Sequence, residues 1–202
     1  MNSTFELSNE ERESVGLDAV PPHWERVMFK DTAAYFDGNT LHKFFSCCDA
    51  RGYLEVDITL ETRDRAFLKP KTTRGKERKI TSAVLVVTER DNGHWFHAVF
   101  NAEKPYVYCF NERNMRGVGF WQDDAPRDYD GLRAYLASWR ASLDDVQRQD
   151  IAETKSAKRQ QVKYAAGDVF RFHVGARQYG FGLLLGGLKQ FRTWGILPEL
   201  HP

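Results

Sequence analysis

The segment 53-YLEVDITL-60 decides the fold class of this chain. Apolar and polar residues alternate along it with a period of two, and no glycine or proline interrupts the alternation. A period of two is typical of a β-strand. We therefore expect a strand here, and a β-rich region around it.

Three neighbouring segments are rich in β-branched and aromatic residues, as strands are. They are 79-KITSAVLVVTER-90, 94-HWFHAVF-100 and 106-YVYCF-110. Asn92 and Gly93 predict a type I′ turn between the first two, and residues 103–105 separate the second from the third. That turn would set His97 across from Thr88 and His94 across from Asp91. Together these features predict an antiparallel meander.

Helices are predicted at two places. Ser8 and Glu11 form a capping box, and Gly16 supplies a left-handed stop, so the first helix is short. From Tyr129 the apolar residues follow a helical period. A second helical segment, with a thin apolar stripe, runs to about residue 161 and is expected to lie on the surface.

The fold class predicted from these elements is α+β, in three parts. Residues 1–128 form a mostly β region, residues 129–161 a helical connector, and residues 162–202 a C-terminal β-hairpin module. An incomplete small β-barrel is one form that this module can take.

Composition excludes several classes of function. The 202 residues are 42% apolar with a net charge of +1, so no overall attraction to nucleic acid follows. The sequence has no secretory signal and no membrane-length apolar segment, which predicts a cytoplasmic protein with no membrane partner. The loop 69–79 carries six positive charges and one negative. It is interpreted as solvated, the alternative being a phosphate-binding arm.

The segment 167-GDVFRFHVGARQYGFGLLLGG-187 predicts a hairpin with a candidate site. A turn at residues 176–177, or a loop over residues 175–178, would set His173 opposite Gly180 and Arg171 opposite Gly182. Glycine in a strand often marks the close approach of a ring or ligand. The two glycines would then form a bare floor beside one titratable group and one cation. The alternative is that aromatic side chains from elsewhere in the chain fill this floor and nothing binds there.

This hairpin also carries a family resemblance. The segment 163-KYAAGDVFRFHVGARQYGFGLLLG-186 resembles the start of the immunity protein 26 domain, a family also labelled phosphotriesterase HocA-like. Four earlier segments resemble the region that precedes this domain in longer members: 7-LSNEERESVGLDAVPPHWERV-27, 35-YFDGNT-40, 61-ETRDRAFLKPKTTRGKERKIT-81 and 131-GLRAYLASW-139. Such members continue with further strands, whereas this chain ends at 191-FRTWGILPELHP-202.

The resemblance implies two functions. The first is a hydrolase of organophosphate triesters, a phosphotriesterase; the second is a non-enzymatic bacterial immunity protein that binds and neutralises a polymorphic toxin. The hydrolase hypothesis makes His173 the general base or metal ligand. It makes Arg171 the group that stabilises the phosphoryl oxygen, and Asp168 an orienting group or a ligand. It makes Gly180, Gly182 and Tyr179 the residues that contact or shape a small neutral substrate.

A divalent metal would suit triester hydrolysis because it activates water. Its ligands would come from carboxylates and the six histidines, but no HxH or HExxH motif occurs. His94 and His97 lie three apart on a strand, so they should point to opposite faces and cannot share one ion. The three cysteines, Cys47, Cys48 and Cys109, are predicted to be reduced thiols.

Overall fold

The computed structural model describes most of the chain. The described residues are 5–48, 52–69, 71–85, 93–103, 105–114, 116–119, 125–156, 158, 165–175, 178–188 and 191–196. Within them, no helix is long and apolar enough to cross a lipid bilayer. The fold is mixed α+β and mostly antiparallel sheet, as the sequence predicts.

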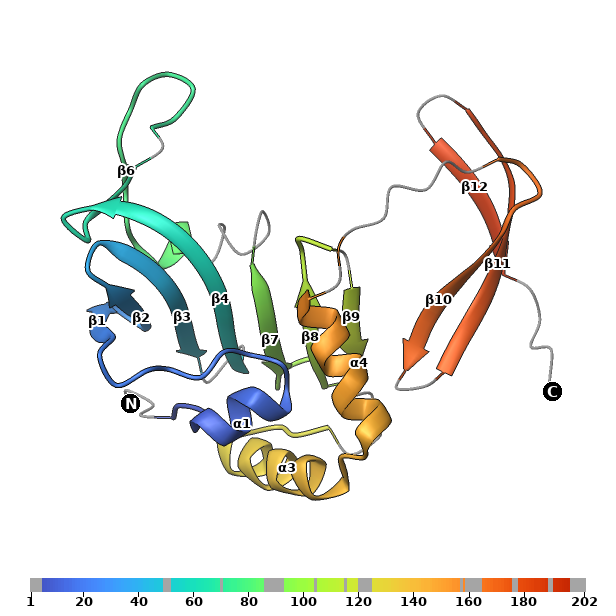
Figure 1. Ribbon diagram of the computed structural model, residues 1–202, viewed down its shortest axis with the longest axis horizontal. Helices are drawn as coiled ribbons and strands as arrows, with labels where there is room; N and C mark the ends of the chain where they lie inside the picture. The colour runs from blue at the N-terminus through green and yellow to red at the C-terminus, as the bar shows by residue number, and fades with distance from the viewer. Residues whose placement is uncertain are drawn as a thin grey trace.

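One curved antiparallel sheet forms most of the molecule (Figure 1). Its strands are β1 (Glu25–Phe29), β2 (Thr32–Asp37), β3 (Thr40–Cys48), β4 (Gly52–Arg63), β7 (His94–Val99), β8 (Tyr106–Asn111) and β9 (Arg116–Gly119), in that spatial order. A short ladder of β5 (Phe67–Leu68) and β6 (Arg78–Lys79) branches from β4. The strand expected at 53–60 lies inside β4, and the hairpin around residues 103–105 is confirmed by the pairing of Val99 with Tyr106.

The strand expected at 79–90 is wrong over residues 82–85. Residues 82–85 form a helical turn, in which Thr81 accepts hydrogen bonds from the backbone N–H groups of Val84 and Leu85. The predicted turn residue Asn92 and residues 86–91 lie outside the described part. The expected pairings of β7 are also wrong. One edge of β7 pairs with β4 and the other with β8.

Three longer helical elements cover one face of this sheet: α1 (Asn9–Ser14), α3 (Tyr129–Ser142) and α4 (Asp145–Ser156). The capping box at Ser8 and Glu11 is confirmed, and Gly16 follows the helix with a φ of 85°. Asp128 caps α3, whose Leu132 and Leu136 are fully buried in the same core cluster as sheet residues. The expected helical connector therefore packs on the main sheet.

Apolar clusters lie on both faces of the main sheet. The cluster under the helices includes Tyr53, Phe96 and Leu136, and the opposite cluster includes Phe44, Val56 and Leu85. Alternate residues of β4 thus enter different cores, since neighbours along a strand point to opposite faces. The period of two in 53–60 separates two buried faces, not a buried face from a solvated one.

A second, three-stranded sheet stands beside the first, beyond β9 (Figure 1). It contains β10 (Val169–Gly175), β11 (Gln178–Leu188) and β12 (Phe191–Ile196), all antiparallel. Within the described residues this sheet is open, and neither core cluster of the main sheet includes any of its side chains. The C-terminal β module is therefore built apart from the main sheet.

Candidate functional site

The predicted register of the C-terminal hairpin is wrong by one residue. Gly175 pairs with Gln178 around residues 176–177, as expected, but a bulge follows and His173 pairs with Tyr179. Beyond the bulge Arg171 pairs with Phe181, while Gly180 and Gly182 pair with Phe172 and Phe170. One extra residue in one strand is enough to shift every later pair.

The glycine floor is consequently not beside Arg171 and His173. A Cβ atom at Gly182 would lie 2.3 Å from Cζ of Phe170, so the phenylalanine ring occupies the space above this glycine. This ring belongs to the cross-strand partner of Gly182 in the same hairpin, so the alternative of aromatic side chains from elsewhere stays a prediction. The position of the Phe170 ring explains why glycine is needed here.

The opposite face of this hairpin is apolar and exposed. Val169 pairs with Leu183 and Arg171 with Phe181, so these four residues share a face. Val169 is 60% exposed, Phe181 42% and Leu185 61%, whereas Leu184, on the other face, is buried. Exposed apolar residues gathered on one face mark an interaction surface more often than scattered ones do. We call Val169, Arg171, Phe181 and Leu183, together with the exposed Leu185 that follows them at a bulge in β11, the hairpin face.

The structure describes only some of the other predicted site residues of the hairpin. Asp168 precedes β10 and orders the turn there, since its carboxylate accepts a hydrogen bond from the Ala165 N–H at 2.7 Å. The side chains of His173 and Tyr179 lie outside the described part of the structure. The catalytic and substrate-binding roles assigned to these residues stay predictions.

A row of polar residues crosses the main sheet on its helix-covered face. Successive cross-strand partners place one residue from each strand in this row: Arg26, Tyr35, Lys43, Asp57, His94, Asn111 and Arg116. The two arginines at its ends are exposed, and the five residues between them are buried. His94 therefore does have a carboxylate neighbour, which is Asp57, whereas Asp91 lies outside the described residues.

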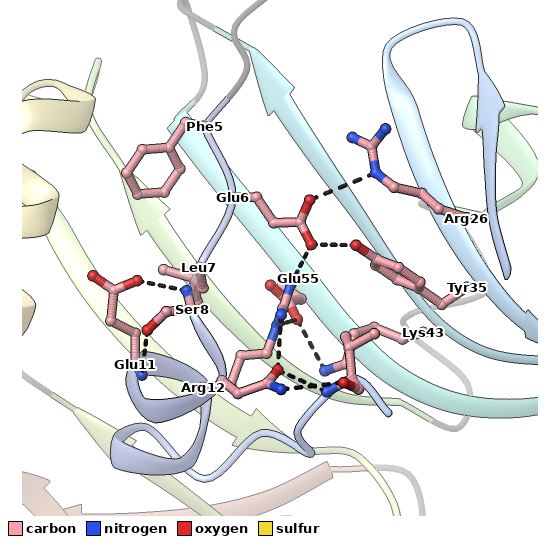
Figure 2. Close-up of polar contacts among 12 residues, drawn as sticks. Phe5, Glu6, Leu7, Ser8, Glu11, Arg12, Arg26, Tyr35, Lys43 and Glu55 are labelled. Carbon is pink, nitrogen blue, oxygen red and sulfur yellow. Dashed lines mark hydrogen bonds and ion pairs between the residues drawn. The ribbon is translucent and has the colours of Figure 1, made fainter. Parts of the chain in front are cut away.

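Charged residues in and next to this row form a continuous buried network (Figure 2). Arg12 reaches from α1 to Glu55 at 2.6 Å and to Glu6 at 2.7 Å. Lys43 bridges Glu55, at 2.9 Å, and Asp57. Two tyrosines complete the network, because the Tyr35 hydroxyl donates to Glu6 and the Tyr53 hydroxyl to Glu55. Each buried charge thus has an opposite partner, which offsets its desolvation.

The pKa values of the two buried carboxylates in this network shift in opposite directions. Burial acts to raise the pKa of Glu55, but Lys43 and Arg12 outweigh it and hold that pKa below its ordinary value. For Asp57 burial prevails over Lys43 and raises the pKa to about 6. The Asp57 carboxyl can therefore change its charge near neutral pH, whereas Glu55 stays ionised.

The two histidines of β7 point to opposite faces, as expected. His94 lies in the polar row with its Nε2 atom 3.1 Å from Sγ of Cys109, and burial lowers its pKa to about 4. His97 packs against Trp95 and Tyr106 on the other face, where burial likewise lowers its pKa to about 4. Both imidazoles are neutral at pH 7.

A pocket of about 640 Å³ opens over one part of the polar row. Asp57, His94 and Asn111 contribute to it from the sheet, the α1–β1 connection adds Asp18 and Trp24, and α4 adds Lys155. The Asp57 carboxylate accepts a hydrogen bond from the Asp18 N–H at 2.6 Å, and Lys155 forms an ion pair with Asp18. Three separate parts of the chain thus meet at the pocket.

The described residues contain no group of three or more histidine, cysteine, aspartate or glutamate side chains that could hold a metal ion. His23 is exposed near Asp37, and His42 stacks on Trp24 with ring centroids 4.7 Å apart. His201 lies outside the described residues. Cys47 and Cys109 are free thiols, and burial raises the pKa of Cys109, so this thiol is unreactive.

No protein-family model matches this chain, and no curated protein and no solved structure matches it either. The polar row is the main feature that sequence reasoning missed. The available signal was the presence of charged residues on one side of a long strand, at Glu55 and Asp57, within a chain that buries both faces of its sheet.

Proposed function

We propose that this protein is a bacterial immunity protein that binds and neutralises a toxin protein in the cytoplasm. The proposal joins the resemblance of residues 163–186 to the immunity protein 26 domain with one structural observation. That observation is the exposed apolar face of the hairpin. The C-terminal module is then the start of such a domain, in the form of an incomplete small barrel.

The composition of the hairpin face suits a protein partner. Phe181 and Arg171 are of the residue types enriched in protein interfaces, and Val169 and Leu185 surround them with apolar area. The face is on a sheet, so its backbone is already ordered before a partner binds. The partner should present an apolar patch.

Co-expression with a candidate toxin domain, taken from a gene that flanks the gene of this chain, tests this proposal. The unchanged chain should protect cells and co-purify with the toxin, while Phe181→Asp should lose both properties. Met28→Asp is the matched control, because Met28 is 53% exposed on β1, away from the hairpin. Failure of the unchanged chain to associate with the toxin, or equal loss in both variants, would contradict the proposal.

The hydrolase of organophosphate triesters, which the same resemblance implies, has less support. Its proposed floor depended on the glycines pairing with Arg171 and His173, and they pair with phenylalanines instead. Turnover of a chromogenic phosphotriester by purified protein, with and without chelator, tests it. Turnover that disappears in His173→Ala would favour the hydrolase over the immunity protein.

A further inference from the structure

We propose that the pocket over the polar row binds a small neutral polyhydroxylated molecule, of the mono- or disaccharide class. This site is separate from the hairpin face and does not depend on the function proposed for that face. Its volume of about 640 Å³ lies in the ordinary range for ligand pockets.

The floor of the pocket is polar and held in place from behind. Asp57 is fixed by Lys43, and the Asn111 side-chain amide donates to the Thr154 carbonyl at 2.9 Å. His94 is held by Cys109 through its Nε2 atom, which leaves the Nδ1 atom of the same ring to pair with a ligand. Groups whose positions are locked by a second layer of contacts are preorganised for a ligand.

The charges around the pocket balance, which disfavours an ionic ligand. Glu13, Asp18 and Asp57 supply carboxylates, whereas Arg113 and Lys155 supply cations, with Lys43 behind the floor. An anion would meet the carboxylates, and a cation would meet the basic side chains. A neutral ligand with many donors and acceptors can pair with both kinds of group.

The walls supply the apolar part of such a site. Trp24 lines one side and is braced by its stacking on His42. Sugars present apolar C–H faces as well as hydroxyl groups, so an aromatic wall above a polar floor complements them. A purely apolar ligand would displace water from the polar floor without offering it a hydrogen bond, which disfavours such a ligand.

Ligand-observed NMR on the full chain tests this inference. The probes are glucose, galactose, mannose, N-acetylglucosamine, maltose and cellobiose, with spermidine and citrate as charged comparisons. We expect at least one sugar to bind and both charged probes to fail. Absence of binding by every sugar, or preference for spermidine or citrate, would overturn the proposal.

A pair of variants locates the binding. Ala19 lines the pocket without belonging to the charge network, so Ala19→Trp should fill the pocket and weaken sugar binding by at least about tenfold. Ala137→Trp, at an exposed position of α3, should leave it unchanged. Phe181→Asp should also leave it unchanged, which separates this test from that of the immunity function. Equal binding by Ala19→Trp and the unchanged chain would overturn the assignment to this pocket.

Discussion

The main sheet and the C-terminal sheet differ in how far their two faces are buried. The main sheet is covered on both faces by core clusters and buries five polar residues of one row, each held by neighbours. The C-terminal sheet buries Leu184 on one face and exposes Val169, Phe181 and Leu185 on the other. One sheet therefore uses its side chains for internal contacts, and the other leaves apolar side chains of one face exposed.

Replacement of Lys43 should have the largest effect on the main sheet. Lys43→Met leaves Glu55 and Asp57 without their shared cation, and removal of one partner from a buried ion pair costs about 3–5 kcal/mol of the free energy of unfolding. Urea denaturation measures this loss, and Lys76→Met, on an exposed loop, is the control. Adding Asp57→Asn to Lys43→Met should recover part of the loss. A loss near zero in Lys43→Met would mean that the network contributes little.

A pH series tests the buried histidines of the main sheet. His94 and His97 stay neutral in the folded chain down to about pH 4, whereas the unfolded chain protonates them below about 6.5, so stability falls as the pH drops through this window. Asp57 acts in the opposite direction, because its folded pKa of about 6 exceeds its ordinary value of 3.8. Two histidines outweigh one aspartate, which predicts a net loss of about 2 kcal/mol between pH 7 and pH 5.

His97→Phe separates these contributions. With one histidine removed, His94 and Asp57 nearly cancel, and we expect less than half of the original pH dependence in urea denaturation at pH 7 and pH 5. An unchanged pH dependence in this variant would show that His97 is not buried as a neutral ring.

Replacement of Gly182 should destabilise the C-terminal sheet and leave the main sheet unchanged. Gly182→Ala places a Cβ in the space of the Phe170 ring, and overpacking of this kind costs about 1–3 kcal/mol. Hydrogen exchange should report faster opening of β10 and β11 alone, since the main sheet has its own core. Adding Phe170→Ala should relieve the overpacking. Uniform destabilisation of both sheets would contradict their separate construction.

A smaller effect is expected at the start of α1. Ser8→Ala removes the side-chain acceptor of the Glu11 N–H and should cost about 1 kcal/mol in urea denaturation. Ser8→Asp, which can accept the same hydrogen bond, should restore most of the stability. Equal stability of Ser8→Ala and the unchanged chain would show that the capping box is dispensable.

The sequence predicted those elements whose signals are local. The capping box of Ser8 and Glu11, the alternation in β4 and the turn between β7 and β8 each depend on a few adjacent residues, and all are confirmed. The strand expected at 79–90 failed over residues 82–85, where capping by Thr81 favours a helical turn over the β propensity of the segment.

The sites were harder to predict because they depend on pairing between distant strands. A single bulge between His173 and Gly175 moved Phe170, and not Arg171, over Gly182. The polar row combines residues such as Lys43, Asp57 and His94, each of which looks isolated in its own strand. Register and strand order bring them together, and neither is visible in the spacing of one segment.

Binding of the neighbouring toxin by hairpin-face variants tests the central claim most directly. Titration calorimetry should compare the unchanged chain, Phe181→Asp, Leu185→Asp and the control Met28→Asp. We expect the two hairpin-face variants to keep their free energies of unfolding within about 0.5 kcal/mol. They should lose binding, while Met28→Asp retains it. Undiminished binding by Phe181→Asp and Leu185→Asp would show that the exposed face of the C-terminal sheet is not the interface.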